Sequence, residues 1–189
     1  MKVVGISGSL RQGSLNTAAL RAAQELAPTG MTIEPAFIGD LPHYNDDLRQ
    51  GGYPPEVERL RSQLAAADAI LFVTPEYNYS IPGVLKNAID WASRPPEQPF
   101  NDKPVAIMGV SGGLLGTARA QYQLRQMLVF LNAHPINKPE VMIGQAASKF
   151  DAEGRLTDET TRGFVRQLLE ALAAWTQRLK GTSAAMAAE

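Results

Sequence analysis

The feature that most constrains the fold of this chain is an alternation of short apolar segments with longer segments of helical periodicity. The apolar segments predict five strands, at residues 2–7, 32–38, 69–74, 104–110 and about 135–143. Alternation of this kind favours right-handed crossover connections and a mostly parallel sheet covered on both faces. The segment 69–74 is apolar instead of alternating, which predicts a central strand buried on both faces.

The segments between and after these strands have the apolar spacing of helices. We expect helices at about 15–26, after Pro54, at 84–92, at 117–131 and from about 157 to a point before Gly181. The length of 189 residues suits a single α/β domain, predicted at 1–180, with a flexible tail at 181–189. Two longer loops, 39–53 and 94–102, are typical of functional segments.

Composition excludes several classes of function. The chain has no cysteine, which removes disulfides, thiolate metal sites and iron–sulfur clusters. His43 and His134 lack neighbours at ligand spacing, so we expect no metal site. The net charge of −1 gives no basic excess for nucleic acid or anionic membranes, and no apolar stretch suits a signal peptide or a membrane span. We therefore expect a soluble, cytoplasmic protein with a small-molecule partner.

A loop rich in glycine and serine joins the first predicted strand to the first predicted helix. It reads Gly-Ser-Leu-Arg-Gln-Gly-Ser-Leu-Asn at residues 8–16. An anion there would meet free backbone N–H groups and the positive end of the helix dipole. Ser9, Ser14 and Asn16 add neutral donors and Arg11 a charged one. The loop predicts a phosphate site, although an ordinary turn with Ser14 as N-cap is the simpler alternative.

Two well-known phosphate loops do not match this segment. Gly8 and Gly13 have the spacing of the P-loop, but Ser14 stands where that motif requires lysine. The dinucleotide fingerprint Gly-x-Gly-x-x-Gly is absent because Gly5 and Gly8 have the wrong spacing. The loop therefore favours a terminal monophosphate over a nucleoside triphosphate or a dinucleotide.

A second loop follows the predicted central strand at its carboxyl end, where open α/β sheets bind their ligands. Pro75 and Pro82 stiffen its ends, so the backbone N–H groups between them can bind the polar edge of a planar heterocycle. Tyr77 and Tyr79 add aromatic surface, and Glu76 is expected to contribute its backbone and not a general base. The alternative is a proline-bounded turn with surface tyrosines.

A third loop, Ser111-Gly112-Gly113, follows the fourth predicted strand. Glycines there allow backbone to approach a ligand closely and to donate hydrogen bonds to the electron-rich pyrimidine edge of a flavin. Since all three loops follow parallel strands, they are predicted to form one site at one sheet edge.

Two long motifs carry a resemblance to a known family. Gly8-Ser9-Leu10-Arg11-x-Gly13-Ser14-x-Asn16 and the segment from Thr74-Pro75-Glu76-Tyr77 to Ile89-Asp90-Trp91 resemble the NADPH-dependent FMN reductases, especially their soluble quinone and chromate reductase branch. The resemblance implies a flavodoxin-like three-layer α/β fold with a five-stranded parallel sheet of order 2-1-3-4-5. It also implies one non-covalent FMN and hydride supplied by NADPH or NADH.

The resemblance and the loops together give a set of site residues. Residues 11–16 would hold the phosphate, 76–79 the isoalloxazine ring and Ser111 its pyrimidine side. No side chain is expected to be catalytic, because N5 of the flavin would carry the hydride. The expected cofactor-binding residues are Ser9, Arg11, Gly13, Ser14, Leu15, Asn16, Thr17, Pro75, Glu76, Tyr77, Asn78, Tyr79, Ser111, Gly112 and Gly113.

The implied activity is reduction of small acceptors such as quinones, with chromate, azo compounds and other metal oxyanions as further candidates. Alternatives are a flavin reductase that releases reduced FMN and a flavodoxin-type electron carrier, although such carriers are strongly acidic. The resemblance implies a homodimer or homotetramer with Arg119, Tyr122 and Glu140 as subunit contacts. The acceptor, the preferred nicotinamide cofactor, the number of subunits, and the roles of Arg94 and the 39–53 loop stay open.

Overall fold

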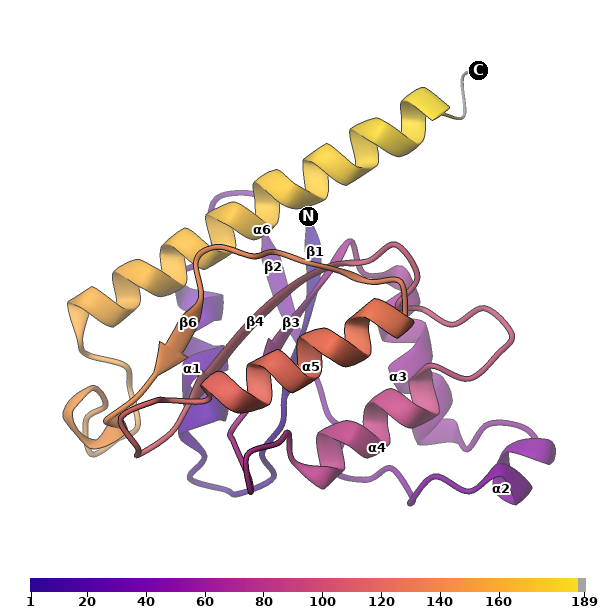
Figure 1. Cartoon of the computed structure of the whole chain (residues 1–189), viewed down its shortest axis with the longest axis horizontal. Coiled ribbons are helices and arrows are strands. Elements are labelled where there is room, and N and C mark those ends of the chain that lie inside the picture. The colour runs from indigo at the N-terminus through magenta and orange to yellow at the C-terminus, as the bar shows by residue number, and fades with distance from the viewer. Residues whose placement is uncertain (187–189) are drawn as a thin grey trace.

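The computed structural model describes residues 1–186, with the side chains of the last helix described as far as Gly181. A parallel sheet lies between two layers of helices (Figure 1). Its strand order β2-β1-β3-β4-β5, with β6 also paired to β4, confirms the predicted order 2-1-3-4-5. The strands are β1 (Lys2–Ser7), β2 (Thr32–Ala36), β3 (Ala69–Val73), β4 (Pro104–Val110), β5 (His134–Pro135) and β6 (Val141–Ile143).

The helices cover the two faces of the sheet unequally. Helices α1 and α6 pack over one core cluster, and α3, α4 and α5 pack over the other. Every residue of β3 is buried, and successive side chains of this strand enter opposite clusters, which explains why the strand is apolar throughout. The helices are α1 (Leu15–Glu25), α2 (Asp46–Gln50), α3 (Pro55–Ala66), α4 (Gly83–Ala92), α5 (Ala118–Phe130) and α6 (Glu159–Met186), with a 3-10 turn η1 (Ala146–Ser148).

The prediction of one fifth strand at about 135–143 is wrong. Two short strands, β5 and β6, pair with the two halves of β4, and the segment between them leaves the sheet. Pro139 lies in that segment, and a proline has no N–H to donate to a strand partner.

The predicted end of the last helix before Gly181 is also wrong, since α6 continues to Met186. One glycine costs a helix interior only about 1 kcal/mol and no proline follows it. The predicted tail 181–189 therefore overlaps α6, and its last part, 187–189, lies outside the described residues. Helix α2, inside the 39–53 loop, was not predicted; it begins after Asn45, whose side chain accepts a hydrogen bond from the Asp47 N–H at 3.0 Å.

The parallel strands bring the three predicted loops to one edge of the sheet. Ser7 pairs with Val73, Val73 with Met108, and Val110 with Ile143, so these strands end at neighbouring positions. The loops after β1, β3, β4 and β6 consequently meet at the carboxyl edge. No helix within residues 1–186 combines the length and apolar character needed to cross a bilayer.

Candidate functional site

The loop after β1 presents unused hydrogen-bond donors at the start of α1. Ser14 is the N-cap: its Oγ accepts from the Thr17 N–H at 3.3 Å and its carbonyl from the Ala18 N–H at 2.9 Å. Nothing within residues 1–186 accepts a hydrogen bond from the N–H groups of Leu15 and Asn16. These two donors lie at the positive end of the helix dipole, which is a place where helices favour anions.

Arg11 adds a charge to this position. Its side chain is exposed and faces the same cavity as Leu15 and Asn16. In the described part of the chain no carboxylate pairs with it, whereas Arg59 and Arg119 both bind carboxylates. An unpaired guanidinium beside free N–H groups is the donor set that a phosphate group prefers.

A cavity of about 250 Å³ opens between the three loops. Its lining contains Ser9, Arg11, Ser14, Leu15, Asn16, Pro75, Glu76, Tyr77, Ser111 and Gly112, all of which were predicted site residues. Five other predicted residues, Gly13, Thr17, Asn78, Tyr79 and Gly113, do not line it. Thr17 instead shares a hydrogen bond of 2.9 Å with the Ser7 hydroxyl.

Sequence reasoning missed two residues of the cavity, Val110 and Ala146. Val110 is the last residue of β4, and Ala146 begins the 3-10 turn after β6. The signal was available for Ala146, because the segment after the fifth predicted strand must reach the same sheet edge as the other loops.

The second loop is a tight turn with two residues in the left-handed region. Tyr77 and Ser80 exchange backbone hydrogen bonds of 2.9 Å in both directions. Asn78 and Tyr79 between them have φ values of 51° and 66°. Positive φ at both central positions is the geometry of a type I′ turn, which asparagine tolerates and tyrosine rarely adopts. The surrounding contacts must therefore hold Tyr79 in place.

Helix α5 supplies those contacts. The Gln123 amide donates to the Tyr79 carbonyl at 2.8 Å and accepts from the Ser80 hydroxyl at 2.5 Å. The guanidinium carbon of Arg119 lies 3.8 Å from the centre of the Tyr79 ring. Arg119 also binds the carboxylate of Glu76, whose side chain is only 6% exposed. Helix α5 thus contacts Glu76, Tyr79 and Ser80, and the Glu76 carboxylate is paired with Arg119.

The third loop is bound to the segment after β6. Ser111 donates its N–H to the Ile143 carbonyl at 2.9 Å and accepts from the Ala146 N–H at 3.3 Å. A Cβ atom at Gly112 would meet no protein atom within 4 Å, so packing within the chain does not require a glycine there. Gly112 is part of the lining of the cavity.

The predicted subunit-contact residues interact within the chain. The Tyr122 hydroxyl donates to the Glu140 carboxylate at 2.8 Å, which raises the pKa of Tyr122, and Arg119 binds Glu76. Arg94 turns back on its own helix end, donating to the Asp90 carbonyl at 3.0 Å and the Ser93 hydroxyl at 3.1 Å. The part of the 39–53 loop at Pro42 and Tyr44 is bound to α4 through Asn87.

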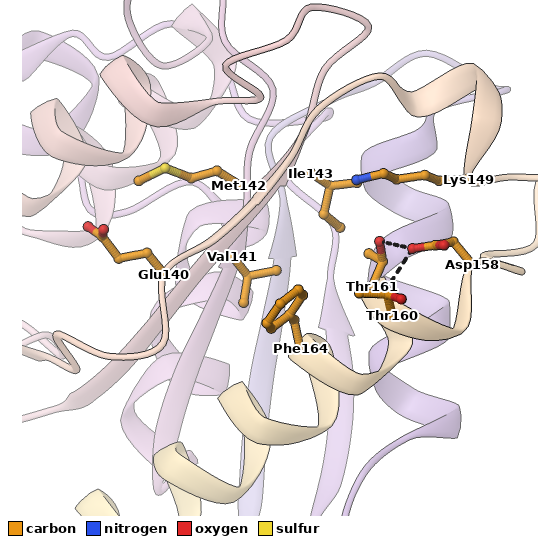
Figure 2. Close-up of a pocket in the computed structure, with 9 residues that line it drawn as sticks. All are labelled: Glu140, Val141, Met142, Ile143, Lys149, Asp158, Thr160, Thr161 and Phe164. Atoms are coloured by element: carbon orange, nitrogen blue, oxygen red, sulfur yellow. Dashed lines mark hydrogen bonds between the residues drawn. The ribbon is translucent and has the colours of Figure 1, made fainter.

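A larger hollow of about 440 Å³ lies beside β6 (Figure 2). Its lining comes from β6, the following loop and the start of α6, and contains none of the predicted cofactor residues. Thr161 donates its N–H to Asp158 at 2.8 Å, and its hydroxyl also donates to this carboxylate. The ring of Phe164 lies next to Val141 (Figure 2). This hollow is larger than the loop cavity, but its lining includes the carboxylates of Glu140 and Asp158, and the Asp158 carboxylate already caps the start of α6.

A parallel sheet of order 2-1-3-4-5, with a cavity between three loops at its carboxyl edge, defines a flavodoxin-like α/β protein. The chain belongs to the NADPH-dependent FMN reductase family, whose model matches residues 1–148. This membership confirms the resemblance that the loop motifs indicated.

Individual relatives match nearly the whole chain. An NAD(P)H-dependent FMN reductase of Pseudomonas aeruginosa is 63% identical over 181 residues, covering 96% of this chain and 98% of its own. A quinone reductase of Escherichia coli K12 is 46% identical over 183 residues, covering 95% and 97%. Among solved structures, the flavoenzyme NAD(P)H:(acceptor) oxidoreductase FerB of Paracoccus denitrificans superposes with a TM-score of 0.85 at 41% identity, covering 94% and 97%.

The residues of the loop cavity fit FMN. The free N–H groups of Leu15 and Asn16 and the unpaired Arg11 suit the doubly charged phosphate. The Glu76 carboxylate, which also lines the cavity, is paired with Arg119, so its charge would not repel that phosphate. The Tyr77 turn and the Ser111 loop provide fixed backbone for a planar ring.

Proposed function

We propose that this protein is an FMN-dependent NAD(P)H oxidoreductase that reduces quinones. The observation that carries the proposal is the unpaired guanidinium of Arg11 beside the free N–H groups of Leu15 and Asn16, in a cavity shared with two rigid loops. The names of the relatives from Pseudomonas aeruginosa and Escherichia coli support both the cofactor and the acceptor.

In this proposal the chain binds and orients, and bound FMN supplies the capacity to accept and donate hydride. The phosphate loop anchors one end of the cofactor, with Ser9, Gly13, Ser14 and Thr17 around it. The other predicted residues, in the loops 75–79 and 111–113, hold the ring. The Glu76 carboxylate accepts hydrogen bonds from the start of α5 and is not available as a base.

We also propose a homodimer or homotetramer. The outer side of α5 exposes Tyr122, Val129 and Phe130, the last of them 86% exposed. Monomers rarely expose several large apolar side chains along one helix. Arg119 and Glu140 border this apolar side and would contribute polar contacts, as the resemblance implies. Cytoplasmic location and the reduction of chromate or azo compounds belong to the proposal with support from the resemblance alone.

Rapid mixing of the FMN-loaded protein with NADH or NADPH under anaerobic conditions tests this function. We expect the flavin absorbance band to bleach with at least one nicotinamide and to return when a quinone is added. If both nicotinamides leave the flavin oxidised, the oxidoreductase proposal fails. An electron carrier would also leave the flavin oxidised. A flavin reductase would show bleaching of the flavin band, and its FMN would then pass through a small-pore filter that retains the protein.

A further inference from the structure

The side chain of Asn16 connects two of the three loops of the cavity. Its Nδ2 donates to the Val110 carbonyl at 3.0 Å, and its Oδ1 accepts from the Val110 N–H at 2.9 Å. Asn16 is 5% exposed, and the two residues are separated by 94 positions in the sequence. Both residues line the cavity, one at the start of α1 and the other at the end of β4.

This pair of hydrogen bonds fills a gap that the sheet leaves at its edge. Strand β3 ends at Val73, and the Thr74 N–H donates to the Met108 carbonyl at 3.0 Å, the last backbone contact between the two segments. Val110 lies two residues further along β4, so its polar groups face the same side as those of Met108. The amide of Asn16 takes the place of a strand residue there and satisfies both groups.

We propose that Asn16 is a positioning residue whose side chain sets the distance between the phosphate loop and the Ser111 loop. The proposal rests on the FMN function argued above and refines the role of one residue in it. The backbone N–H of Asn16 is one of the two donors assigned to the proposed phosphate position, while its side-chain oxygen and one Nδ2 hydrogen are committed to Val110. Ser111, which follows Val110 directly, is the residue expected at the pyrimidine side of the ring.

A fixed position of the Ser111 loop matters because the flavin ring is expected to contact this loop. If the Asn16 side chain no longer holds Val110, the Ser111 loop is free to move, and binding of the ring must order it again, which lowers affinity. A residue that holds this loop in place therefore affects the binding of the ring, whether or not a phosphate is present. A direct side-chain ligand of the phosphate affects FMN alone.

The test compares FMN with riboflavin, which has the same ring and ribityl chain but no phosphate. Asn16→Leu removes both hydrogen bonds and keeps the same number and branching of side-chain heavy atoms. We expect affinity for both flavins to fall by a similar factor, roughly tenfold, so the ratio of the two affinities stays as in the wild-type protein. Arg11→Ala should lower the affinity for FMN only and move that ratio toward one.

Asn87→Leu is the matched control. Asn87 makes the same pair of contacts with main chain elsewhere, accepting from the Tyr44 N–H at 2.8 Å and donating to the Pro42 carbonyl at 2.9 Å, and it does not line the cavity. It should lower stability but leave both flavin affinities unchanged, which separates positioning from general loss of packing.

Asn16→Asp provides a second variant if Asn16→Leu does not fold. The carboxylate can accept from Val110 but cannot donate to its carbonyl until it is protonated. We expect weak riboflavin binding at neutral pH that recovers in mild acid, while riboflavin binding by the wild-type protein stays flat. Riboflavin has no group that titrates in this range, so the recovery reports the restored donor.

Three results would overturn the positioning role: unchanged affinities in the Asn16 variants, a loss confined to FMN, or no riboflavin binding by the wild-type protein. All three are compatible with FMN binding and reduction by NAD(P)H. Failure of the wild-type protein to bind FMN would instead refute the proposed function.

Discussion

Glu76 and Arg119 form an ion pair that joins the loop after β3 to the start of α5. The Arg119 Nε lies 2.5 Å from one carboxylate oxygen of Glu76, and the N–H groups of Arg119 and Ala120 donate to the other oxygen at 3.0 and 3.1 Å. The carboxylate thus caps a helix from a position 43 residues earlier in the chain.

Replacing Glu76 should affect binding and stability without removing a catalytic base. Glu76→Gln keeps the shape but loses the charge and one acceptor, and we expect a loss of about 2 kcal/mol in the free energy of unfolding. FMN affinity should fall, while the pH profile of kcat keeps its shape. Gln123→Ala, which frees the same turn without touching a carboxylate, is the control. A flattened pH profile in Glu76→Gln alone would assign Glu76 to proton transfer.

Gly109 is predicted to be irreplaceable. A Cβ atom there would lie 2.1 Å from the Thr74 carbonyl oxygen and 2.3 Å from the Thr117 hydroxyl. Since one of these is backbone in a fully buried region, we expect Gly109→Ala to cost at least about 3 kcal/mol in urea unfolding. Gly13→Ala, where a Cβ atom meets nothing within 4 Å, should change stability by less than about 0.5 kcal/mol. Equal stability of the two variants would contradict this account of the sheet edge.

Arg61 should stabilise the fold more than an exposed arginine does. It is 9% exposed and donates to the carbonyls of Ala92, Arg94 and Pro96 at 2.6–2.8 Å. Arg61→Met removes the donor from the Ala92 and Pro96 carbonyls and leaves the Arg94 carbonyl with the Tyr53 hydroxyl alone, so we expect a loss of about 3 kcal/mol in the free energy of unfolding. Arg59→Met removes an exposed ion pair from the same helix and should cost about 1 kcal/mol or less.

Because the pKa of Asp68 is lowered, the free energy of unfolding should decrease in acid. Hydrogen bonds from the Lys180 ammonium and the Lys2 N–H lower the pKa of Asp68 below 3.8. The ionised carboxylate therefore stabilises the fold above that value, and this stability is lost as the pH falls through the lowered pKa. In thermal unfolding, the wild-type protein should exceed Asp68→Asn in stability at about pH 6, by roughly 1 kcal/mol, and approach it near about pH 2. A constant difference would contradict the lowered pKa.

The parts of the fold that followed from the sequence are those set by local pattern. Strands β3 and β4 are apolar and buried throughout, and β3 shows why: its side chains enter both core clusters, whereas β2, at the edge of the sheet, is mixed in pattern. The prediction of a single fifth strand was wrong because that segment includes Pro139, which interrupts strand pairing. The predicted end of α6 was wrong because Gly181 alone, with no proline after it, is a weak helix breaker.

The location of the site was predictable and its internal contacts were not. Loops after parallel strands must share an edge, so the residues from Ser9 to Gly112 could be assigned to one cavity. Asn16 binds Val110, which is 94 residues away, and Glu76 caps α5 from 43 residues away. A single sequence carries no signal for contacts between residues so far apart. From the sequence, Asn16 and Glu76 are each expected to act only within their own loop.

A crystal structure of the protein with bound FMN tests the central claim most directly. We expect one FMN per chain, with its phosphate oxygens within hydrogen-bonding distance of the N–H groups of Leu15 and Asn16 and of the Arg11 guanidinium, and its ring against the Tyr77 and Ser111 loops. An FMN whose phosphate lies elsewhere, for example in the hollow beside β6, would contradict the assignment of the site.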